Sequence, residues 1–337
     1  RYFMTLTQLR FIVAIADANL NITQAATKVH ATQPGLSKQL KLLEDELGFQ
    51  LFTRRARSVE AITPAGEKVL KHARIILAEA ANIRAVAANL RRDADGELLI
   101  ATTHTQARYV LPRPLAALKQ RFPQVALHVA PGGDAETVAR HEKGEADIAI
   151  VSSSGTPPQS HLTLPIYLSD RLVLVPRGHP LTTLERELTL ADIAAHPLIS
   201  YESSRAADSS LRRAFQDAGL APDISVTARD ADLIKTYVRT GLGVGILAEM
   251  AVDGSDGDLV ALPARGLFPT CTTWLLIRKD RVLRDYTEAL IRTLIPEIDL
   301  RDLRRALTDG EPLHLAPRTW TQREDLSKPA PVGEFQI

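Results

Sequence analysis

The chain has 337 residues, more than one typical hydrophobic core accommodates, so two or three domains are expected. Its hydrophobic fraction of 45% and charged fraction of 24% are those of a globular protein, and its net charge of +1 excludes a global bias towards nucleic acid. Cys271 is the only cysteine, which excludes a disulfide within the chain and fits a reducing cytoplasm. The chain shows no signal-peptide pattern and no apolar run near the roughly 20 residues that span a bilayer, so we expect a cytoplasmic protein with no membrane partner.

An amphipathic helix over Thr5–Ala18 is the first predicted element. Two short helices joined by a tight turn are expected next, over Ile22–Leu43. Thr23 is the expected N-cap of the first and Thr32 that of the second, because a threonine hydroxyl can accept from the free amides of a first turn. The second helix should bury one face, because its apolar residues recur at helical spacing. These are Leu36, Leu40 and Leu43.

The opposite face of the second helix carries amide, hydroxyl and ammonium groups, at Gln33, Ser37, Lys38 and Lys41. Such groups bind phosphates or base edges in a major groove, so the pair has the pattern of a helix-turn-helix. An ordinary helix hairpin with a solvated polar face has the same pattern. From this stretch alone, both interpretations stay open.

Two short strands joined by an arginine-rich turn are expected after the helix pair, because apolar residues alternate on both sides of Arg54, Arg55 and Arg57. A wing of this kind places cations over the DNA backbone beside the groove. It also supplies the local basic patch that the net charge conceals. A solvated charge run is the alternative, and the position directly after a candidate recognition helix favours the wing.

A long helix is predicted from Thr63, its N-cap, to about residue 92, with Pro64 at its first position. A helix of roughly 30 residues is about 45 Å long. Large apolar residues recur along it every seven positions, with alanines between them, as in a coiled coil. Such a seam is too apolar to stand alone, so we expect a dimer with a second copy of the chain. The seam residues are Val69, Ala73, Ile76, Ala80, Ile83, Ala87 and Leu90.

Beyond a linker at residues 93–96, strand and helix signals alternate up to residue 295, which predicts an α/β unit with a mostly parallel sheet. A late strand and helix indicate that the chain crosses to a second lobe near Ser169 and returns near Thr270. Two lobes with ligand between them are the architecture of periplasmic binding proteins. The predicted fold class is therefore α+β and multi-domain. The expected parts are a winged helix-turn-helix (4–63), a linker and dimerisation helix (64–95), lobe I (96–169 with 270–299), lobe II (170–269) and an irregular C-terminal extension (300–337).

Uncharged hydrogen-bond donors cluster after the first strand of this α/β unit. Ligands of open α/β sheets bind at the carboxyl ends of strands, where helix N-termini favour anions. Routine N-capping would use one threonine and leaves the other donors unexplained. A serine that ends a later strand should face the same cleft, and a serine and an arginine of a lobe II loop should lie opposite. The candidate effector-binding residues are Thr103, Thr105, Gln106, Ser152, Ser204 and Arg205.

Residues 5–66 resemble the winged helix-turn-helix of LysR-type transcriptional regulators, in the combined pattern A-A, T-Q-P-G-L-S, L-E-x-E-L-G, L-F-x-R and T-P-A-G. With the two-lobed unit, the resemblance covers nearly the whole chain and implies a DNA-binding regulator rather than an enzyme. Its implied partners are double-stranded promoter DNA, a small-molecule effector, RNA polymerase and further copies of the chain, as a homodimer or homotetramer. The resemblance places Thr32, Gln33, Pro34, Ser37 and Lys38 at the DNA groove, and Arg54 and Arg55 on the backbone.

Two further stretches, IATTHTQARYVLP and DADLIKTYVRTGLGVGILAEMAV, are similar to the CysB-type subgroup, which regulates sulfur assimilation and cysteine synthesis. The similarity implies sulfate, thiosulfate or an O- or N-acetylserine-like effector, with Thr103, Thr105, Gln106 and Ser152 around the anion. Ser152 replaces a threonine and keeps its hydroxyl. In the loop SYESSRAADSS, Ala206 replaces a ligand-facing threonine. Glu202 could repel an anion there, while Arg205 and Arg229 could attract one.

Other chemistry is less favoured by the sequence. His104 is expected to line the cleft rather than act as a base, and the remaining histidines lack metal-ligand spacing, so neither a metal nor a cofactor is expected. The GLGVG stretch at 241–245 follows a helix and is interpreted as a tight turn rather than a dinucleotide fingerprint. Two alternatives remain: a LysR-type regulator of another pathway, and an enzyme or transport-type binding protein with an unrelated helical N-terminus.

Overall fold

The computed structural model describes residues 4–55, 58–160 and 162–327. Contacts divide it into two compact units. The first extends to Arg92 and also contains Asp280–Arg284, and the second begins at Asp93. None of the helices in the described ranges is long and apolar enough to cross a membrane.

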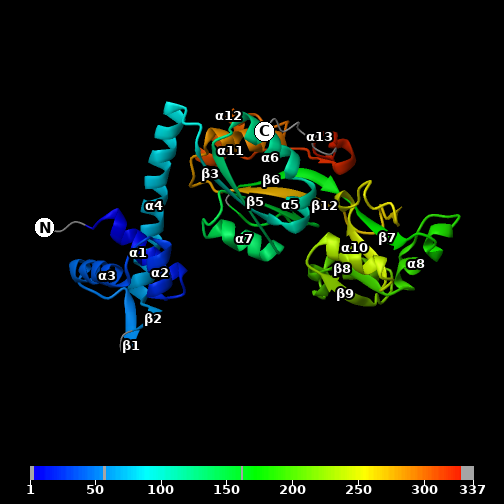
Figure 1. The fold of residues 1–337 in the computed structure, drawn as a ribbon, viewed down its shortest axis with the longest axis horizontal. Coiled ribbons are helices and arrows are strands. Elements are labelled where there is room, and N and C mark those ends of the chain that lie inside the picture. The colour runs from blue at the N-terminus through cyan, green and yellow to red at the C-terminus, as the bar shows by residue number, and fades with distance from the viewer. Residues whose placement is uncertain (1–3, 56–57, 161, 328–337) are drawn as a thin grey trace, which may run out of the picture. The chain divides into compact units, whose positions relative to one another are not determined.

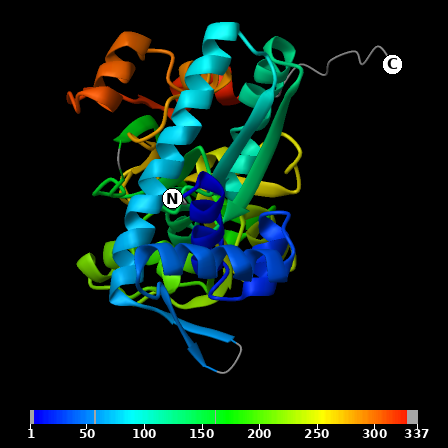
Figure 2. The same cartoon turned by 90° about the vertical axis from the view of Figure 1, so that its left-hand side faces the viewer.

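The first unit is a helix-turn-helix with a two-stranded wing, followed by one long helix (Figure 1). The two strands pair antiparallel and extend away from the helices as a hairpin (Figure 2). The prediction of a winged helix-turn-helix is therefore confirmed. The elements are α1 (Leu6–Asp17), α2 (Ile22–Lys28), α3 (Gln33–Leu47), β1 (Phe52–Arg55), β2 (Ser58–Ile62) and α4 (Pro64–Arg91).

Side chains at the helix ends explain where α2 and α3 begin and stop. The Thr32 hydroxyl accepts from the Gly35 amide at 3.2 Å, as expected. The expected N-cap of α2 is wrong: Asn21, not Thr23, caps this helix by accepting from the Gln24 amide at 3.0 Å. Asparagine is an N-cap at least as good as threonine, so α2 begins two residues earlier than threonine alone would indicate.

The core of this unit lies between α1, α2, α3 and the first part of α4. Ala73 of α4 is only 1% exposed because it packs in this core, and Val69 packs against it. The predicted seam of α4 is therefore used in two ways. Its first part is buried within the chain itself, whereas Ile76, Ile83 and Leu90 further along remain 39%, 70% and 81% exposed.

The last part of α4 is bound to the segment Asp280–Arg284. The Asn82 amide donates to the Asp280 carbonyl at 2.8 Å and accepts from the Val282 amide at 2.9 Å. Two helical turns further along α4, Asn89 donates to the Leu283 carbonyl at 2.8 Å. Two asparagine side chains, seven residues apart, thus hold a segment that is distant in sequence.

The second unit contains two lobes, each built on its own sheet. The six-stranded sheet has the order β13-β6-β12-β5-β3-β4, and the five-stranded sheet has the order β11-β7-β10-β8-β9. The first sheet consists of β3 (Gly96–Thr103), β4 (Val125–Gly132), β5 (Ile148–Ser153), β6 (Leu162–Ser169), β12 (Cys271–Ile277) and β13 (Arg318–Thr319). The second consists of β7 (Arg171–Pro176), β8 (Leu198–Tyr201), β9 (Ile224–Ala228), β10 (Val244–Ala248) and β11 (Leu259–Pro263).

Both sheets are mixed: three of the five pairings in the six-stranded sheet and two of the four in the five-stranded sheet are parallel, so the expectation of a mostly parallel sheet is met only in part. Strand β12 is antiparallel to both of its neighbours, β5 and β6, and β7 is antiparallel to β10 and β11. These are the strands next to the two crossings between the lobes, where the chain leaves one sheet and later returns in the opposite direction. Strands β6, β8 and β11 were not anticipated.

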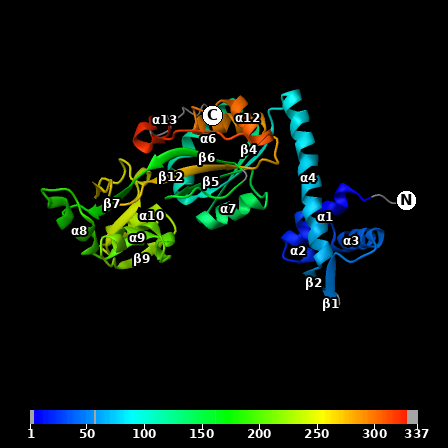
Figure 3. The same cartoon turned by 180° about the vertical axis from the view of Figure 1, so that it is seen from behind.

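Helices cover both faces of the six-stranded sheet. In Figures 1 and 3, α7 lies on one side of the sheet, and α6, α11 and α12 lie on the other. The lobe II helices α9 and α10 bury their apolar faces on the five-stranded sheet. The helices of this unit are α5 (His104–Tyr109), α6 (Pro112–Arg121), α7 (Asp134–Glu142), α8 (Leu190–Ala194), α9 (Ser210–Asp217), α10 (Ala231–Arg239), α11 (Asp285–Leu294), α12 (Leu300–Thr308) and α13 (Glu324–Ser327).

The expectation of an irregular segment from residue 300 onwards is wrong over the described part. It forms α12, the short edge strand β13, and α13. Arg323, only 1% exposed, explains why this part is ordered. Its guanidinium donates to the carbonyls of Ile166 and Leu294 at 3.1 and 2.9 Å, and it pairs with Asp325 at 2.7 Å. The polar composition of this segment gave no indication that Arg323 would be buried and hold it in place.

A Gly66→Ala substitution should destabilise the first unit, because a Cβ at this position would lie 2.1 Å from the Leu51 carbonyl oxygen. Overpacking of this kind costs about 1–3 kcal/mol. Hydrogen exchange of the α1–α3 amides measures the loss, and protection there should fall. Lys68→Ala, an exposed position on the same helix, is the control and should leave protection unchanged. Equal protection in both variants would contradict the prediction.

Candidate functional site

The candidate DNA-binding residues of α3 share an accessible face. Thr32, Gln33, Pro34 and Lys38 are exposed, and Ser37 is half-buried. They are held in place from behind by Leu36, Leu40 and Leu43, each at most 1% exposed. A rigid helix that presents amide, hydroxyl and ammonium groups can enter a major groove.

The two candidate arginines of the wing differ in their surroundings. Arg54 donates to the Glu44 carboxylate at 3.0 Å, and this buried carboxylate also accepts from the Leu51 amide at 2.8 Å. Arg54 therefore also stabilises the junction between α3 and the wing. The Arg55 side chain is 83% exposed and lies 3.9 Å from Glu60, which leaves it accessible to phosphate. Arg57 lies outside the described residues.

The candidate effector residues of lobe I gather at the carboxyl edge of its sheet. Strands β3, β4 and β5 are parallel neighbours, and Thr103 and Ser152 lie at or next to their carboxyl ends. Thr103 precedes α5 and is half-buried. Within the described part of the chain, its hydroxyl makes no capping bond. Thr103 therefore keeps a free hydroxyl at the position where open α/β sheets bind ligands.

Gln106 is the centre of a buried hydrogen-bond network. Its carbonyl accepts from the Tyr167 hydroxyl at 2.6 Å, and its amide nitrogen donates to the Ser152 and Thr273 hydroxyls at 3.2 and 3.4 Å. Ser152 and Thr273 are themselves 2.8 Å apart. Burial raises the pKa of Tyr167 far above its usual value, which keeps it a neutral donor.

Tyr167 and Thr273 of this network were missed in the sequence. Tyr167 lies on β6, a strand that was not anticipated, and Thr273 lies on β12, whose register opposite Ser152 depends on the return crossing. Thr273 lies in the late strand that the sequence predicts after the return crossing near Thr270. Only the pairing of that strand with β5 gives its hydroxyl a role.

Lobe II approaches α5 through Tyr201. The Thr105 hydroxyl donates to the Tyr201 hydroxyl over a long 3.5 Å, and the Ala248 amide donates to the same oxygen at 3.2 Å. The Ser204 hydroxyl is buried and donates to the Tyr201 carbonyl at 2.6 Å. Arg205 is exposed. The structure thus brings Thr105 to Tyr201, whereas Ser204 is engaged within its own loop.

Arg229, the second cation that was expected to attract an anion, lies close to a carboxylate. Arg229 is 70% exposed and lies 3.6 Å from the Glu202 carboxylate. Glu202 is thus partly neutralised by Arg229, which reduces both the repulsion and the attraction anticipated for this loop.

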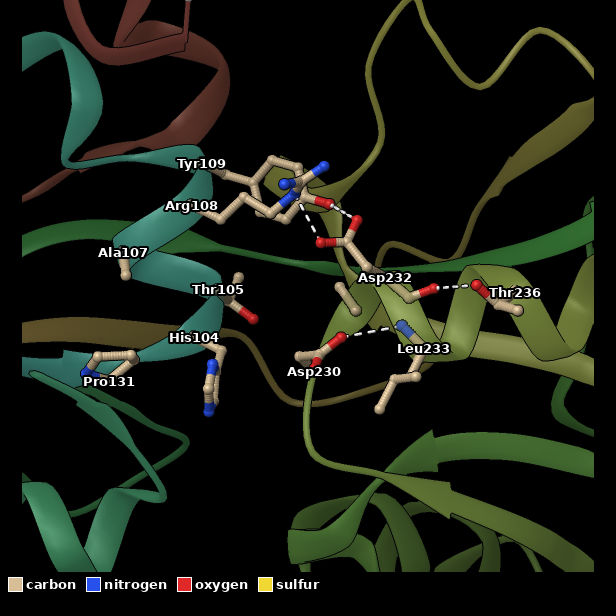
Figure 4. Close-up of a pocket in the computed structure, with 11 residues that line it drawn as sticks. His104, Thr105, Ala107, Arg108, Tyr109, Pro131, Asp230, Asp232, Leu233 and Thr236 are labelled. Carbon is tan, nitrogen blue, oxygen red and sulfur yellow. Dashed lines mark hydrogen bonds and ion pairs between the residues drawn. The ribbon is translucent and has the colours of Figure 1, made fainter.

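A pocket of about 600 Å³ opens between α5 of lobe I and α10 of lobe II (Figure 4). On one side of it, Asp232 accepts from the Tyr109 hydroxyl at 2.7 Å and pairs with the Arg108 guanidinium at 2.6 Å. These bonds connect the two lobes directly. The pocket is lined by His104, Thr105, Ala107, Arg108, Tyr109, Pro131, Asp230, Ala231, Asp232, Leu233 and Thr236.

Metal and dinucleotide chemistry find no support in this arrangement. Within the described ranges, no group of three or more His, Cys, Asp or Glu side chains could hold a metal ion. The glycine-rich stretch at 241–245 is a tight turn from α10 into β10, as expected. A Cβ at Gly243 would lie 2.4 Å from the Pro197 carbonyl oxygen, so close packing explains this glycine.

Two family models match the chain. The LysR substrate binding domain matches residues 91–298, and the bacterial regulatory helix-turn-helix protein of the lysR family matches residues 6–67. The transcriptional regulator CysB of Haemophilus influenzae is 41% identical over 88% of this chain and 91% of its own length. SsuR of Burkholderia cenocepacia is 38% identical over 91% of this chain and 100% of its own length.

Solved structures agree. The cofactor-binding domain of the Cbl transcriptional regulator is 37% identical, with a TM-score of 0.59 over 64% of this chain and 94% of its own. A full-length OxyR variant from Pseudomonas aeruginosa is 27% identical, with a TM-score of 0.66 over 88% of this chain and 99% of its own. The resemblance to the CysB-type subgroup is thus confirmed. The chain belongs to the LysR family of DNA-binding transcriptional regulators with an effector-binding domain, and is not an enzyme.

Proposed function

We propose that this regulator controls genes of sulfur assimilation or cysteine synthesis, and that a small anionic or acylated-amino-acid effector binds at Thr103, Thr105, Gln106 and Ser152. The observation that carries the site is the free Thr103 hydroxyl beside the Gln106–Ser152 hydrogen bond, at the carboxyl edge of the lobe I sheet. Relatives named CysB, SsuR and Cbl support the pathway. A LysR-type regulator of another pathway, with a different effector, is the alternative.

The effector would act by changing how the lobes meet. A ligand between Thr103 and Tyr201 would alter the 3.5 Å contact of Thr105 with Tyr201, which is longer than the hydrogen bonds that Gln106 and Tyr109 of α5 make. Ser204 and Arg205 would approach the ligand from lobe II on closure. A ligand shifts such an equilibrium only by its differential affinity for the two states.

The response would reach the DNA-binding unit through Asp280–Arg284. This segment follows β12, which carries Thr273, and it is bound by Asn82 and Asn89 of α4. A shift of β12 would therefore act on α4. In the cytoplasm, where promoter DNA and RNA polymerase are found, the output would be altered promoter binding or altered contact with polymerase.

The exposed apolar face of α4 would pair with a second copy. Ile75, Ile83 and Leu90 are 52%, 70% and 81% exposed, which is unusual for aliphatic side chains on one helix. Pairing would bury them and present two recognition helices to paired half-sites. A homotetramer would combine two such dimers.

The effector site is tested first by DNA binding with and without sulfate, thiosulfate and O-acetylserine. Thr103→Val keeps the shape of the side chain and removes its free hydroxyl. Effector affinity should fall about tenfold, because a hydrogen bond to a charged group contributes about 1.5–3 kcal/mol. Calorimetry measures this, and DNA affinity without effector should stay unchanged. Thr272→Val on β12 is the control, and an equal loss in both variants would argue against the site.

The recognition surface is tested by Lys38→Ala. Removal of one exposed ammonium group that contacts DNA should weaken promoter binding about tenfold and reduce its salt dependence. Fluorescence anisotropy at several salt concentrations measures both quantities. Lys143→Ala, an exposed lysine after α7, is the matched control. Unchanged binding by the Lys38 variant would remove this residue from the interface.

The dimer face is tested by Ile83→Glu, which would place a charge in the pairing surface of α4. The variant should dissociate to monomers and bind a two-half-site promoter less tightly, because both recognition helices are then no longer delivered together. Light scattering after size exclusion measures the mass. Arg84→Glu, at the adjacent exposed position, should leave the oligomer intact. A dimeric Ile83 variant would place the interface elsewhere.

A further inference from the structure

Glu44 is a carboxylate at a position where α3 otherwise carries apolar side chains. It follows Leu36 and Leu40 at the four-residue spacing that places side chains on one face of a helix, and it is only 7% exposed. A buried carboxylate costs free energy unless hydrogen-bond donors surround it. Glu44 therefore marks a point where the recognition helix is bound to another part of the chain.

The donors to this carboxylate come from the beginning of the wing. The Oε1 atom of Glu44 accepts from the backbone amides of Leu51 and Phe52, which we call the wing root, at 2.8 and 3.3 Å. The Oε2 atom accepts from Nη2 of Arg54 at 3.0 Å. The two oxygens thus have separate roles: one holds the backbone of the wing root, and the other holds a side chain of the wing.

The alternation of side chains along β1 decides which arginine reaches Glu44. Phe52 is fully buried, and Arg54, two residues later, lies on the same side of the strand, towards α3. Arg55 lies on the opposite side. The register of β1 against β2 shifts between Thr53 and Arg54, and irregularities of this kind re-aim side chains. Strand geometry therefore separates two arginines that are adjacent in the sequence.

The two arginines differ in freedom and in charge balance. The Arg54 side chain is 38% exposed and its guanidinium has five N–H donors, so it can contact DNA while it stays bound to Glu44. Its position relative to α3 is fixed and its charge is balanced. Arg55 lies 3.9 Å from Glu60, and because both side chains are exposed, water and salt weaken this pair. Arg55 can follow a phosphate, whereas Arg54 is held in place.

We propose that Glu44 is a positioning residue for DNA recognition, which makes Arg54 a determinant of sequence specificity, whereas Arg55 contributes affinity for any duplex. A guanidinium fixed against the recognition helix contacts DNA only where the backbone runs at the matching distance from the groove that this helix occupies. That distance depends on the shape and deformability of the sequence. A cation that can follow any phosphate carries no such information. This role belongs to the DNA-binding unit and does not depend on which effector or pathway the regulator serves.

Two duplexes of equal length and base composition separate specificity from affinity. One is selected from a random pool by binding to the wild-type full chain, and the other is a shuffled version of it. Fluorescence anisotropy at several salt concentrations gives both affinities, their ratio and their salt dependence. Arg54→Gln should weaken binding of the selected duplex about tenfold and that of the shuffled duplex about twofold or less. Arg55→Gln should weaken both by the same factor and reduce the salt slope by about one.

Glu44→Gln keeps an oxygen for the wing-root amides but removes the charge that binds Arg54. The ratio of the two affinities should fall about tenfold, because the selected duplex loses the fixed guanidinium while the shuffled duplex gains from one fewer negative charge. Asp45→Asn is the matched control, since it removes a carboxylate from an exposed position on the same turn of α3, and it should leave the ratio unchanged. In the Arg54→Gln background, Glu44→Gln should no longer change the ratio.

The buried carboxylate also supports the fold, so a second variant leaves Glu44 intact. Arg54→Lys keeps the charge at an exposed position, but an ammonium group lacks the planar fork with which a guanidinium holds a carboxylate and contacts DNA at once. The ratio should fall in this variant as well, with the salt slope unchanged. Hydrogen exchange of the α1–α3 amides shows that each variant is folded.

A wild-type ratio in folded Arg54→Lys would overturn the proposal, as would an Arg54→Gln loss that is equal on both duplexes. If Glu44→Gln lowers the ratio equally with and without Arg54, its role lies at the wing root alone, which would also overturn it. Selection that enriches no duplex would overturn it and would count against the regulator itself. A missing response to sulfate, thiosulfate and O-acetylserine, by contrast, would contradict only the proposed effector.

Discussion

A buried side-chain amide has to satisfy its donors and its acceptor, and in this protein that requirement determines the geometry of the effector unit. Gln106 is 2% exposed, and its partners come from three separate strands, β5, β6 and β12. Loss of any partner would leave a buried polar group unpaired, at a cost of about 1–3 kcal/mol. The network therefore fixes α5 against the sheet and sets where Thr103 and Thr105 stand. It also joins the strand before the first crossing to the strand after the return.

Helix α4 likewise contacts several parts of the chain. Its first part completes the core of the DNA-binding unit through Leu70 and Ala73, and its later part holds Asp280–Arg284 through two asparagine amides. One helix thus serves as a core element in its first part, and as both anchor and candidate dimer face in its later part. Apolar residues that share a heptad position need not share a function, because the surroundings of α4 change along its length. This is why Ala73 is buried while Leu90 is exposed.

Several charged side chains of the effector unit are paired with opposite charges of the same unit. Asp232 is paired with Arg108, and Arg229, one of the two cations that the sequence singled out, lies 3.6 Å from Glu202. Arg171 differs because its Nη1 is buried and unpartnered among the described residues. Its position explains why it was overlooked. In the sequence it is simply the polar residue that opens an apolar strand.

The amino-acid sequence by itself determined the winged helix-turn-helix, the long helix and the family, because these depend on local patterns: a cap at Thr32, Leu36–Leu40–Leu43 spacing and a glycine at 66 that admits no Cβ. It also placed Thr103 and Gln106 at a sheet edge, since the ends of parallel strands can be inferred from strand–helix alternation. Only the tertiary structure decided the antiparallel pairing of β12, the roles of Tyr167 and Thr273, and the anchoring of the C-terminal part by Arg323. The physical reason is range. Caps, turns and periodicity act over a few residues, whereas the buried network joins Gln106 to Tyr167, 61 residues away, and Ser152 to Thr273, 121 residues away, and only folding brings such segments together.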